Sequence, residues 1–292
     1  MGGPSSEREV SLRSGAAVAK GLSESGYDVV QVDISGHEVD LPCGVEAAFV
    51  ALHGEFGEDG QIQSILNQKG VPYTGSGAEA SRASFDKELS KKICDAANVP
   101  TPAYQVITKG GPTQCRLALP VVIKPACQGS SIGVHKIVEA SHWNEALSDS
   151  LKYDERVIVE EFVPGRELTV GVVGEEALPI VEIVAPDGWY DYKAKYTKGA
   201  SQYRCPAVMD DSLYTRCQGL AVRTFKALGC RGFGRVDFRL SPEGGLYVLE
   251  LNNIPGFTET SLLPKAAAQA GMSFPALCDR IMCMARLDDE SA

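Results

Sequence analysis

Apolar and polar residues along the chain follow two periods, which predict alternating helices and strands. Within residues 58–69, Ile62, Ile65 and Leu66 recur at the spacing of one helical face. Shorter runs rich in β-branched residues, such as Val157–Glu161, are typical of strands. Helices are predicted at Ser6–Gly26, opened by a Ser6-x-x-Glu9 capping box, and at Glu58–Lys69, Ser84–Asn98 and Asp211–Leu228. Strands are predicted at Tyr27–Ile34, Ala47–Leu52, Val71–Thr74, Ala103–Ile107, Val121–Lys124, Val134–Val138, Val157–Glu161, Leu168–Val173 and Ile180–Val184.

This order of elements predicts an α/β protein built from α+β lobes, since no repeat or low-complexity linker interrupts it. Residues 1–80 read as a small open-sheet N-terminal domain, residues 81–162 as a central lobe and residues 163–292 as a C-terminal lobe. Gly2-Gly3 resembles a turn that follows a strand, so we expect the natural chain to begin upstream with an apolar first strand.

The most informative stretch is residues 232–256, which reads as a hairpin around the turn residues 241–245. Asp237 and Glu250 are equidistant from the turn and would pair across it, while Arg235 and Asn252 stay on the same side. Two carboxylates and an amide oxygen form an incomplete oxygen shell suited to Mg²⁺. The intervening apolar residues would bury the other face: Val236, Phe238, Leu249 and Leu251.

Two further segments carry candidate chemistry. Residues 124–133 place a lysine beside a loop of small residues, where backbone N–H groups and an ammonium could bind phosphate, although such a loop is more often a plain hairpin. Residues 190–197 contain Lys195 and Tyr196 on a connection that could close over reactants. An ordinary polar surface loop explains the second segment equally well.

The composition of the chain argues against several classes of function and site. The formal net charge of -10 argues against a nucleic-acid surface, which needs clustered basic residues. The 9 cysteines include no C-x-x-C pair, so neither a disulfide framework nor a zinc site is indicated, and reduced cytoplasmic thiols fit better. No apolar run is long enough to span a bilayer.

Several motifs together resemble one known family. SSEREVSLRSG, ALHGEFGEDGQIQ, VIKPACQGSSIGV, VIVEEFVPGRELTVGVV, YDYKAKY, GFGRVDF and LELNNIPGFTETSL occur in an order similar to the D-alanine-D-alanine ligases of the ATP-grasp superfamily. The resemblance covers nearly the whole chain. It implies a three-lobed ATP-grasp architecture, with ATP bound between the second and third lobes and two D-alanine molecules where all three meet. It also implies a cytoplasmic homodimer.

The resemblance assigns nucleotide and metal roles to individual residues. Mg²⁺ or Mn²⁺, with two ions per site, would be bound by Asp237, Glu250 and Asn252. ATP, the co-substrate, would contact Lys87, Lys124, Glu160, Val163, Glu167 and Lys195.

It also assigns the amino-acid substrates. D-alanine would be surrounded by Glu7, His53, Arg235, Gly256, Ser261 and Leu262, and Glu7, Ser130, Tyr196 and Arg235 would be the catalytic group. ATP would convert the first D-alanine into an acyl phosphate, which the amine of the second would attack.

Some of these residues have ordinary explanations when they are considered alone. Glu7 could simply favour a helix dipole, and Lys87 could lie on a solvated charged face. His53 follows a predicted strand at its carboxyl end, which somewhat favours a site role. Cys127 is read as a bystander, with oxidation sensitivity as the alternative.

Three functions remain open from the sequence. The leading one is a ligase that makes D-alanyl-D-alanine for peptidoglycan. A related ligase would use D-lactate or D-serine as the second substrate. A nucleotide-binding protein that has lost catalysis belongs to a different class.

Overall fold

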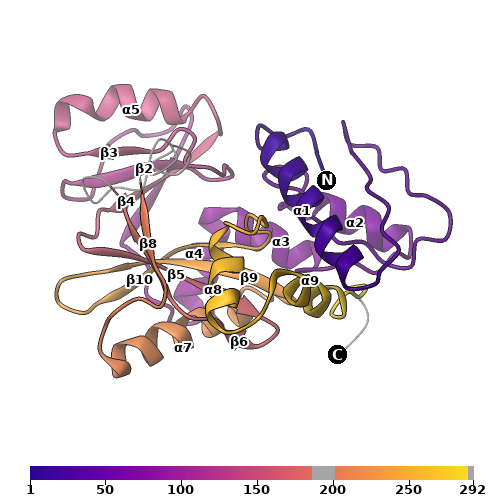
Figure 1. The fold of residues 1–292 in the computed structure, drawn as a ribbon. Helices are drawn as coiled ribbons and strands as arrows, with labels where there is room; N and C mark the ends of the chain where they lie inside the picture. The colour runs from indigo at the N-terminus through magenta and orange to yellow at the C-terminus, as the bar shows by residue number, and fades with distance from the viewer. Residues whose placement is uncertain (186–200, 289–292) are drawn as a thin grey trace.

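The computed structural model describes residues 1–185 and 201–288 as a mixed arrangement of helices and two antiparallel sheets (Figure 1). None of the helices within those residues is long and apolar enough to cross a bilayer. The longer helices are α1 (Arg8–Glu24), α2 (Gln61–Gln68), α3 (Ala78–Phe85), α4 (Lys87–Ala96), α5 (Trp143–Ser150), α7 (Asp211–Ala227), α8 (Leu262–Gln269) and α9 (Phe274–Met282).

The central lobe is built on a four-stranded sheet of order β1-β4-β2-β3. Its strands are β1 (Tyr104–Thr108), β4 (Arg156–Glu161), β2 (Val121–Pro125) and β3 (His135–Ile137). The short 3-10 helix Ala140–His142 leads into α5, whose Ala146 and Leu147 pack on Ile123 and Val157 in one apolar cluster. Figure 1 shows α5 covering one face of this sheet, so the other face is turned toward the rest of the molecule.

The C-terminal lobe contains a six-stranded sheet, of order β10-β9-β5-β7-β8, with β6 paired to β5. Its strands are β5 (Arg166–Val173), β6 (Glu176–Ala177), β7 (Val181–Val184), β8 (Gln202–Arg204), β9 (Phe233–Leu240) and β10 (Leu246–Asn252). Every residue of β9 is buried, because α7 covers one face of the sheet with Leu220, Ala221 and Phe225. The predicted strands of both later lobes and the predicted helix Asp211–Leu228 are confirmed to within two residues at each end.

The N-terminal lobe is joined to the C-terminal lobe by an apolar cluster. Val18 and Leu22 of α1 pack with Leu277 and Ile281 of α9, and Phe257 lies in the same cluster. Helix α1 therefore has a fixed position relative to the β9–β10 hairpin, which matters because Glu7 immediately precedes α1.

The predicted N-terminal strands are wrong as regular strands. Within the described residues, the segments 27–34, 47–52 and 71–74 form isolated bridges only, Gly2 to Ile34, Ala48 to Tyr73 and Tyr73 to Arg286. Backbone hydrogen bonds join residues 1–3 to residues 32–34, and Ala48 to Pro72 and Thr74, so pairing is present but short. The capping box is also wrong, because Glu7 occupies the N-cap of α1 and makes no side-chain capping bond.

The predicted helix Ser84–Asn98 is two helices that meet at Asp86. Asp86 has extended backbone angles and accepts hydrogen bonds from the N–H groups of Glu88 and Leu89, so it caps α4. Arg156 contacts both Asp86 and Glu88, at 2.7 and 2.5 Å. Burial opposes the charge on Asp86, but Arg156 and the two N–H groups hold the pKa of its carboxyl below the usual value. The break thus fixes the first residue of α4, Lys87.

Candidate active site

The β9–β10 hairpin presents its polar residues in the predicted register. Asp237 pairs with Glu250, and Arg235 pairs with Asn252. The register shifts between Val248 and Glu250, so Leu249 is the extra residue of a β-bulge. The expected burial of Leu249 on the opposite face is therefore wrong, since it lines the cavity described below.

Asp237 has a full set of hydrogen-bond partners. Arg235 donates to both carboxylate oxygens at 2.9 and 2.8 Å, Thr169 donates to Oδ1, and the Asn252 amide donates to Oδ2 at 2.9 Å. A carboxylate offers about four lone-pair positions, and these contacts occupy them. A half-turn of the Asn252 amide would replace its N–H₂ group with an oxygen and leave one Asp237 position open. With that change, Asp237, Glu250 and Asn252 fit the oxygen-ligand preference of Mg²⁺.

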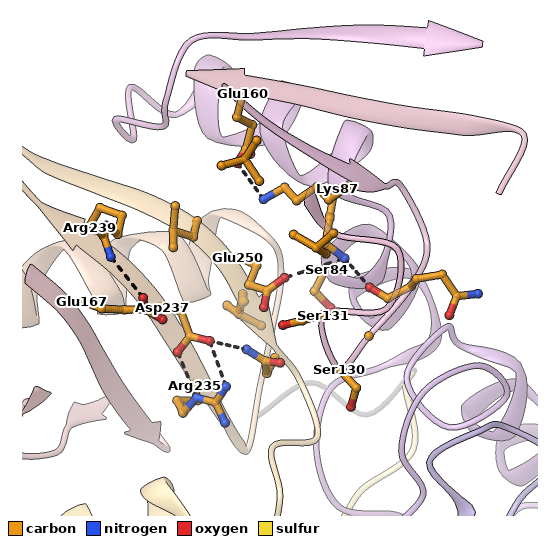
Figure 2. Close-up of a pocket in the computed structure, with 18 of the residues that line it drawn as sticks. Ser84, Lys87, Ser130, Ser131, Glu160, Glu167, Arg235, Asp237, Arg239 and Glu250 are labelled. Atoms are coloured by element: carbon orange, nitrogen blue, oxygen red, sulfur yellow. Dashed lines mark hydrogen bonds and ion pairs between the residues drawn. The ribbon is translucent and has the colours of Figure 1, made fainter. Parts of the chain in front are cut away.

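A cavity of about 150 Å³ lies between the central sheet and the β9–β10 hairpin. Figure 2 shows Lys87 and Glu250 approaching one another from opposite sides of it, with Asp237 and Arg235 side by side on β9. The predicted nucleotide and metal residues that line it are Lys87, Lys124, Glu160, Val163, Glu167, Asp237, Glu250 and Asn252. The fold therefore brings together residues from α4, both sheets and the connection between them.

Lys87 reaches the cavity from the first turn of α4. Its Nζ donates to the carbonyl of Gln128 at 2.7 Å and lies 3.7 Å from Glu250 Oε2. The residue is 9% exposed, so the solvated-face reading of residues 86–88 is wrong. The ammonium instead connects the loop of residues 126–133 with the hairpin.

Glu160 lies between two lysines on the central sheet. Lys124 contacts one of its carboxylate oxygens at 2.8 Å, and Lys91 of α4 contacts the other at 2.8 Å. Burial acts to raise the pKa of Glu160, but the two ammonium groups outweigh it and hold that pKa below its usual value. Glu160 is therefore an anion at neutral pH.

Glu167 and Arg239 form the wall opposite the central sheet. Arg239 Nη1 lies 3.1 Å from Glu167 Oε2, and its Nε donates to the carbonyl of Val163 at 3.0 Å. Burial raises the pKa of Glu167 to about 7, against the attraction of Arg239. Figure 2 shows this pair on neighbouring strands of the C-terminal sheet. The carbonyl of Val163 is thereby fixed at the connection between the lobes.

The small-residue loop after β2 approaches Glu7 closely. Ser130 donates a hydrogen bond to Glu7 Oε1, although Ser130 and Ser131 have the positive φ angles of 51° and 58° that favour glycine. A methyl group at Gly129 would lie 2.7 Å from Glu7 Oε2. A side chain at this position would therefore displace the Glu7 carboxylate from the loop backbone.

A second cavity, of about 390 Å³, adjoins the first. It contains the predicted amino-acid residues Glu7, His53, Ser130, Arg235, Gly256, Ser261 and Leu262. Five residues line both cavities and mark their junction: Glu58, Gly129, Ser130, Arg235 and Asn252. A group transferred from one cavity to the other would pass this point.

His53 is fixed by contacts on both ring nitrogens. Its Nδ1 lies 3.0 Å from the carbonyl of Ile254 and 3.6 Å from Glu58, so Nδ1 carries a proton, and its Nε2 lies 2.9 Å from the Ser14 hydroxyl. The residue is buried within the second cavity wall. The ring thus presents an oriented polar edge rather than a mobile side chain.

The far wall of this cavity is the beginning of α8. Ser261 is the N-cap residue, but its hydroxyl contacts Thr258 rather than the first turn of its own helix. The N–H groups of that turn therefore have no side-chain cap, and helix N-termini bind carboxylates. The position of Leu262 just after the cap is consistent with binding a substrate carboxylate.

Sequence reasoning missed several residues at these cavities. Glu58 borders both of them, and burial raises its pKa. Lys91 and Arg239 pair with Glu160 and Glu167. The motif ALHGEFGEDGQIQ contains Glu58, and Arg239 lies two residues beyond Asp237 on the same strand face, so both had a signal in the pattern. Lys91 had none. Lys195 and Tyr196 lie outside the described residues.

Comparison with known proteins identifies the family. The family model described as D-ala D-ala ligase C-terminus matches residues 93–283, and the model described as D-ala D-ala ligase N-terminus matches residues 36–76. The chain belongs to the D-alanine-D-alanine ligase family. The resemblance of the sequence motifs is thus confirmed.

Members of the D-alanine-D-alanine ligase family resemble this chain over nearly its full length. A protein named D-alanine-D-alanine ligase from Methylacidiphilum infernorum is 45% identical over 281 residues, covering 96% of this chain and 92% of that protein. The protein of the same name from Syntrophotalea carbinolica is 45% identical over 291 residues, covering 98% of this chain and 95% of that protein.

Solved structures of the family confirm the ATP-grasp fold. The D-alanine-D-alanine ligase of Bacillus anthracis in complex with ATP has a TM-score of 0.85 and 29% identity, covering 97% of this chain and 94% of that one. A second structure of the same enzyme has a TM-score of 0.86 and 32% identity, covering 97% and 95%.

Proposed function

We propose that this chain is an ATP-dependent ligase that joins two D-alanine molecules into D-alanyl-D-alanine for peptidoglycan synthesis. The observation that carries this proposal is the junction of the two cavities at Ser130 and Arg235. One cavity has the lysines and carboxylates of a nucleotide-phosphate site, and the other has a carboxylate and an open helix N-terminus. The carboxylate of the second cavity can bind the ammonium group of an amino acid, and the open helix N-terminus can bind its carboxylate.

The first step would take place at that junction. A carboxylate oxygen of the first D-alanine attacks the γ-phosphorus of ATP, and the bond to the β-phosphate oxygen breaks to leave ADP. Lys87 and Lys124 would neutralise the phosphate charge, and Glu7 would bind the ammonium of D-alanine. Ser130 supports this role because its hydrogen bond fixes the position of Glu7.

The second step would form the peptide bond. The amine of the second D-alanine, after losing a proton, attacks the acyl-phosphate carbon, and inorganic phosphate leaves. Arg235 and the backbone near Gly256 would stabilise the negative oxygen of the tetrahedral intermediate, because charged and backbone donors act strongly in a site without water. The N–H groups at Ser261 and Leu262 would bind the carboxylate of the second substrate.

The remaining parts of the proposal concern metals and location. Asp237, Glu250 and Asn252 would hold Mg²⁺ or Mn²⁺, with two ions per site, and the metal would neutralise phosphate charge and orient ATP. Glu160 and Val163 would contact adenine, and Glu167 the ribose. Lys195 and Tyr196 would close over the reactants.

The nine free cysteines support a cytoplasmic enzyme. A homodimer is proposed by family resemblance, and the residue limits 1–80, 81–162 and 163–292 remain the proposed lobes.

The test is release of phosphate from MgATP in the presence of D-alanine, with the product identified by mass spectrometry. We expect release with D-alanine and no release with L-alanine. Competition with D-lactate and D-serine would measure the acceptor preference. Phosphate release without any dependence on D-alanine, or no release at all, would overturn the proposal.

A further inference from the structure

Lys91 contacts the nucleotide cavity only through another residue. It does not line the cavity, yet its Nζ lies 2.8 Å from Glu160 Oε1, while Lys124 Nζ lies 2.8 Å from Oε2. The three side chains are 3%, 4% and 9% exposed for Lys91, Glu160 and Lys124. Two ammonium groups therefore share one buried carboxylate, and only Lys124 and Glu160 face the cavity.

The surroundings of Lys91 hold it in this position. Its Nζ donates to the carbonyl of Pro102 at 3.3 Å and lies 4.8 Å from the centre of the Tyr104 ring. Burial lowers the pKa of Lys91 from its ordinary value of 10.5, while the charge of Glu160 acts to raise it. The 2.8 Å contact between Lys91 Nζ and Glu160 Oε1 favours the ammonium form of Lys91.

The cavity has its basic residues paired with carboxylates. Its described lining contains four basic residues and six carboxylic acids: Lys87, Lys124, Arg235, Arg239, and Glu58, Glu160, Glu161, Glu167, Asp237 and Glu250. The two arginines each contact a carboxylate of the lining, and Lys87 lies near Glu250. Much of the positive charge of the lining is therefore shared with carboxylates before a polyphosphate enters.

The cluster around Glu160 changes that balance. With Lys91, the three side chains carry a net charge of one positive unit, whereas Glu160 and Lys124 alone would carry none. Solvent screens the extra charge only weakly, because the Lys91 side chain is 3% exposed. The charge therefore acts on the adjoining cavity across the Glu160 carboxylate.

We propose that Lys91 is a positioning residue that neutralises Glu160 from behind, so that the charge of Lys124 is available to the nucleotide phosphates. This inference rests on the proposed nucleotide site. It differs from a purely structural role for the buried cluster, since it requires that phosphate binding follow the net charge of the three residues.

The test compares Lys91→Met, Glu160→Gln and the double variant, whose clusters carry net charges of zero, two and one positive units. Isothermal calorimetry would measure the binding of MgADP and of magnesium tripolyphosphate, which has no base to contact Glu160. We expect Lys91→Met to bind both probes at least about tenfold more weakly than the parent. The double variant should bind tripolyphosphate within about threefold of the parent.

Recovery in the double variant distinguishes charge from structure. If Lys91 only supports packing, the double variant will bind as weakly as Lys91→Met or more weakly, which would overturn the inference. If Lys91→Met does not fold, Glu160→Gln and the double variant still decide the question, because Glu160→Gln must bind tripolyphosphate more tightly. Equal affinity of Glu160→Gln and the double variant for tripolyphosphate would also overturn the inference.

Kinetics and a control variant complete the design. Lys91→Met should raise KM for ATP without changing KM for D-alanine. Lys92→Met, which removes a surface partner of Glu88 from the same helix, should match the parent in every assay. If the parent protein fails to bind MgADP, the proposed function is wrong. If the parent binds MgADP but the affinities of the variants do not follow the net charge of the cluster, only this inference is wrong.

Discussion

Ser130 hydrogen-bonds to Glu7 across 123 positions of sequence, from a loop of the central lobe to the start of the first helix. The contact lies where the two cavities meet, and it depends on the close approach of the loop backbone. Glu7 also lies near Gly54, where an added methyl group would come within 2.9 Å of its Oε2. Two glycines thus leave the space that this carboxylate occupies.

Gly129→Ala should weaken binding of the first D-alanine while leaving the fold intact. The added methyl group would lie 2.7 Å from Glu7 Oε2, and the end of a flexible side chain can move away at little cost in stability. Loss of one charge-assisted hydrogen bond corresponds to about 1–3 kcal/mol, so we expect KM for the first D-alanine to rise about tenfold. Steady-state kinetics and thermal melting would measure both effects.

The matched control is Gly219→Ala, because a methyl group there meets no atom within 4 Å and Gly219 lies inside α7. It should keep full activity and raise stability by about 0.5–1 kcal/mol. An unchanged KM in Gly129→Ala would show that Glu7 does not bind the substrate.

Glu250→Gln should abolish turnover without unfolding the protein. The amide has nearly the same shape, but it removes a negative charge opposite Asp237 and is a poorer ligand for a hard cation. We expect D-alanine-dependent phosphate release to fall at least about a hundredfold at ordinary Mg²⁺ concentration. Glu243→Gln, in the exposed turn of the same hairpin, should behave like the parent. Normal release from Glu250→Gln would remove the metal assignment.

Cys127 should be chemically inert despite its place in the phosphate loop. Burial, together with the nearby charges of Asp86 and Asp154, raises the pKa of its thiol to about 12, so the reactive thiolate is scarce at neutral pH. Iodoacetamide should modify the exposed Cys43 and Cys283 of the native protein first. Mass spectrometry of tryptic peptides would give the order, and early labelling of Cys127 would support the oxidation-sensitive alternative.

Asp288 should stabilise the contact between the C-terminal segment and the N-terminal lobe. It accepts hydrogen bonds from Tyr73, Asn67 and the backbone of Ala78, and Arg231 lies 3.1 Å away. Burial opposes its charge, but these partners hold the pKa of Asp288 below the usual value. Asp288→Asn should therefore lower the melting temperature by a few degrees at pH 7.

The pH dependence has a definite sign. A depressed folded-state pKa stabilises the protein above the unfolded value of about 3.9, and that contribution is lost as pH falls through the folded-state pKa. The difference in melting temperature between the parent and Asp288→Asn should thus shrink below about pH 4. Glu175→Gln, on an 80% exposed side chain, should show no difference at any pH. A constant difference for Asp288→Asn would contradict an ionic contribution.

The amino-acid sequence by itself determined the elements that are locally encoded. The β9–β10 hairpin has a turn and alternating residues close together in the chain, so the pairing of Asp237 with Glu250 could be predicted. The bulge at Leu249 could not, because a one-residue insertion in a ladder depends on packing against the neighbouring strand. The break before Lys87 was missed for a similar reason, since its stabilising partner Arg156 is distant in sequence.

Only the tertiary structure decided which residues face one another across the lobes. Glu7, considered alone, was a helix-capping acid, and its contact with Ser130 arises because α1 is packed on α9 beside the hairpin. Lys91 gave no signal at all, since its role depends on Glu160, which is far away along the chain. The physical reason is that sequence periodicity reports burial of one face of an element. The position of a charge relative to another lobe is determined by packing over the whole molecule.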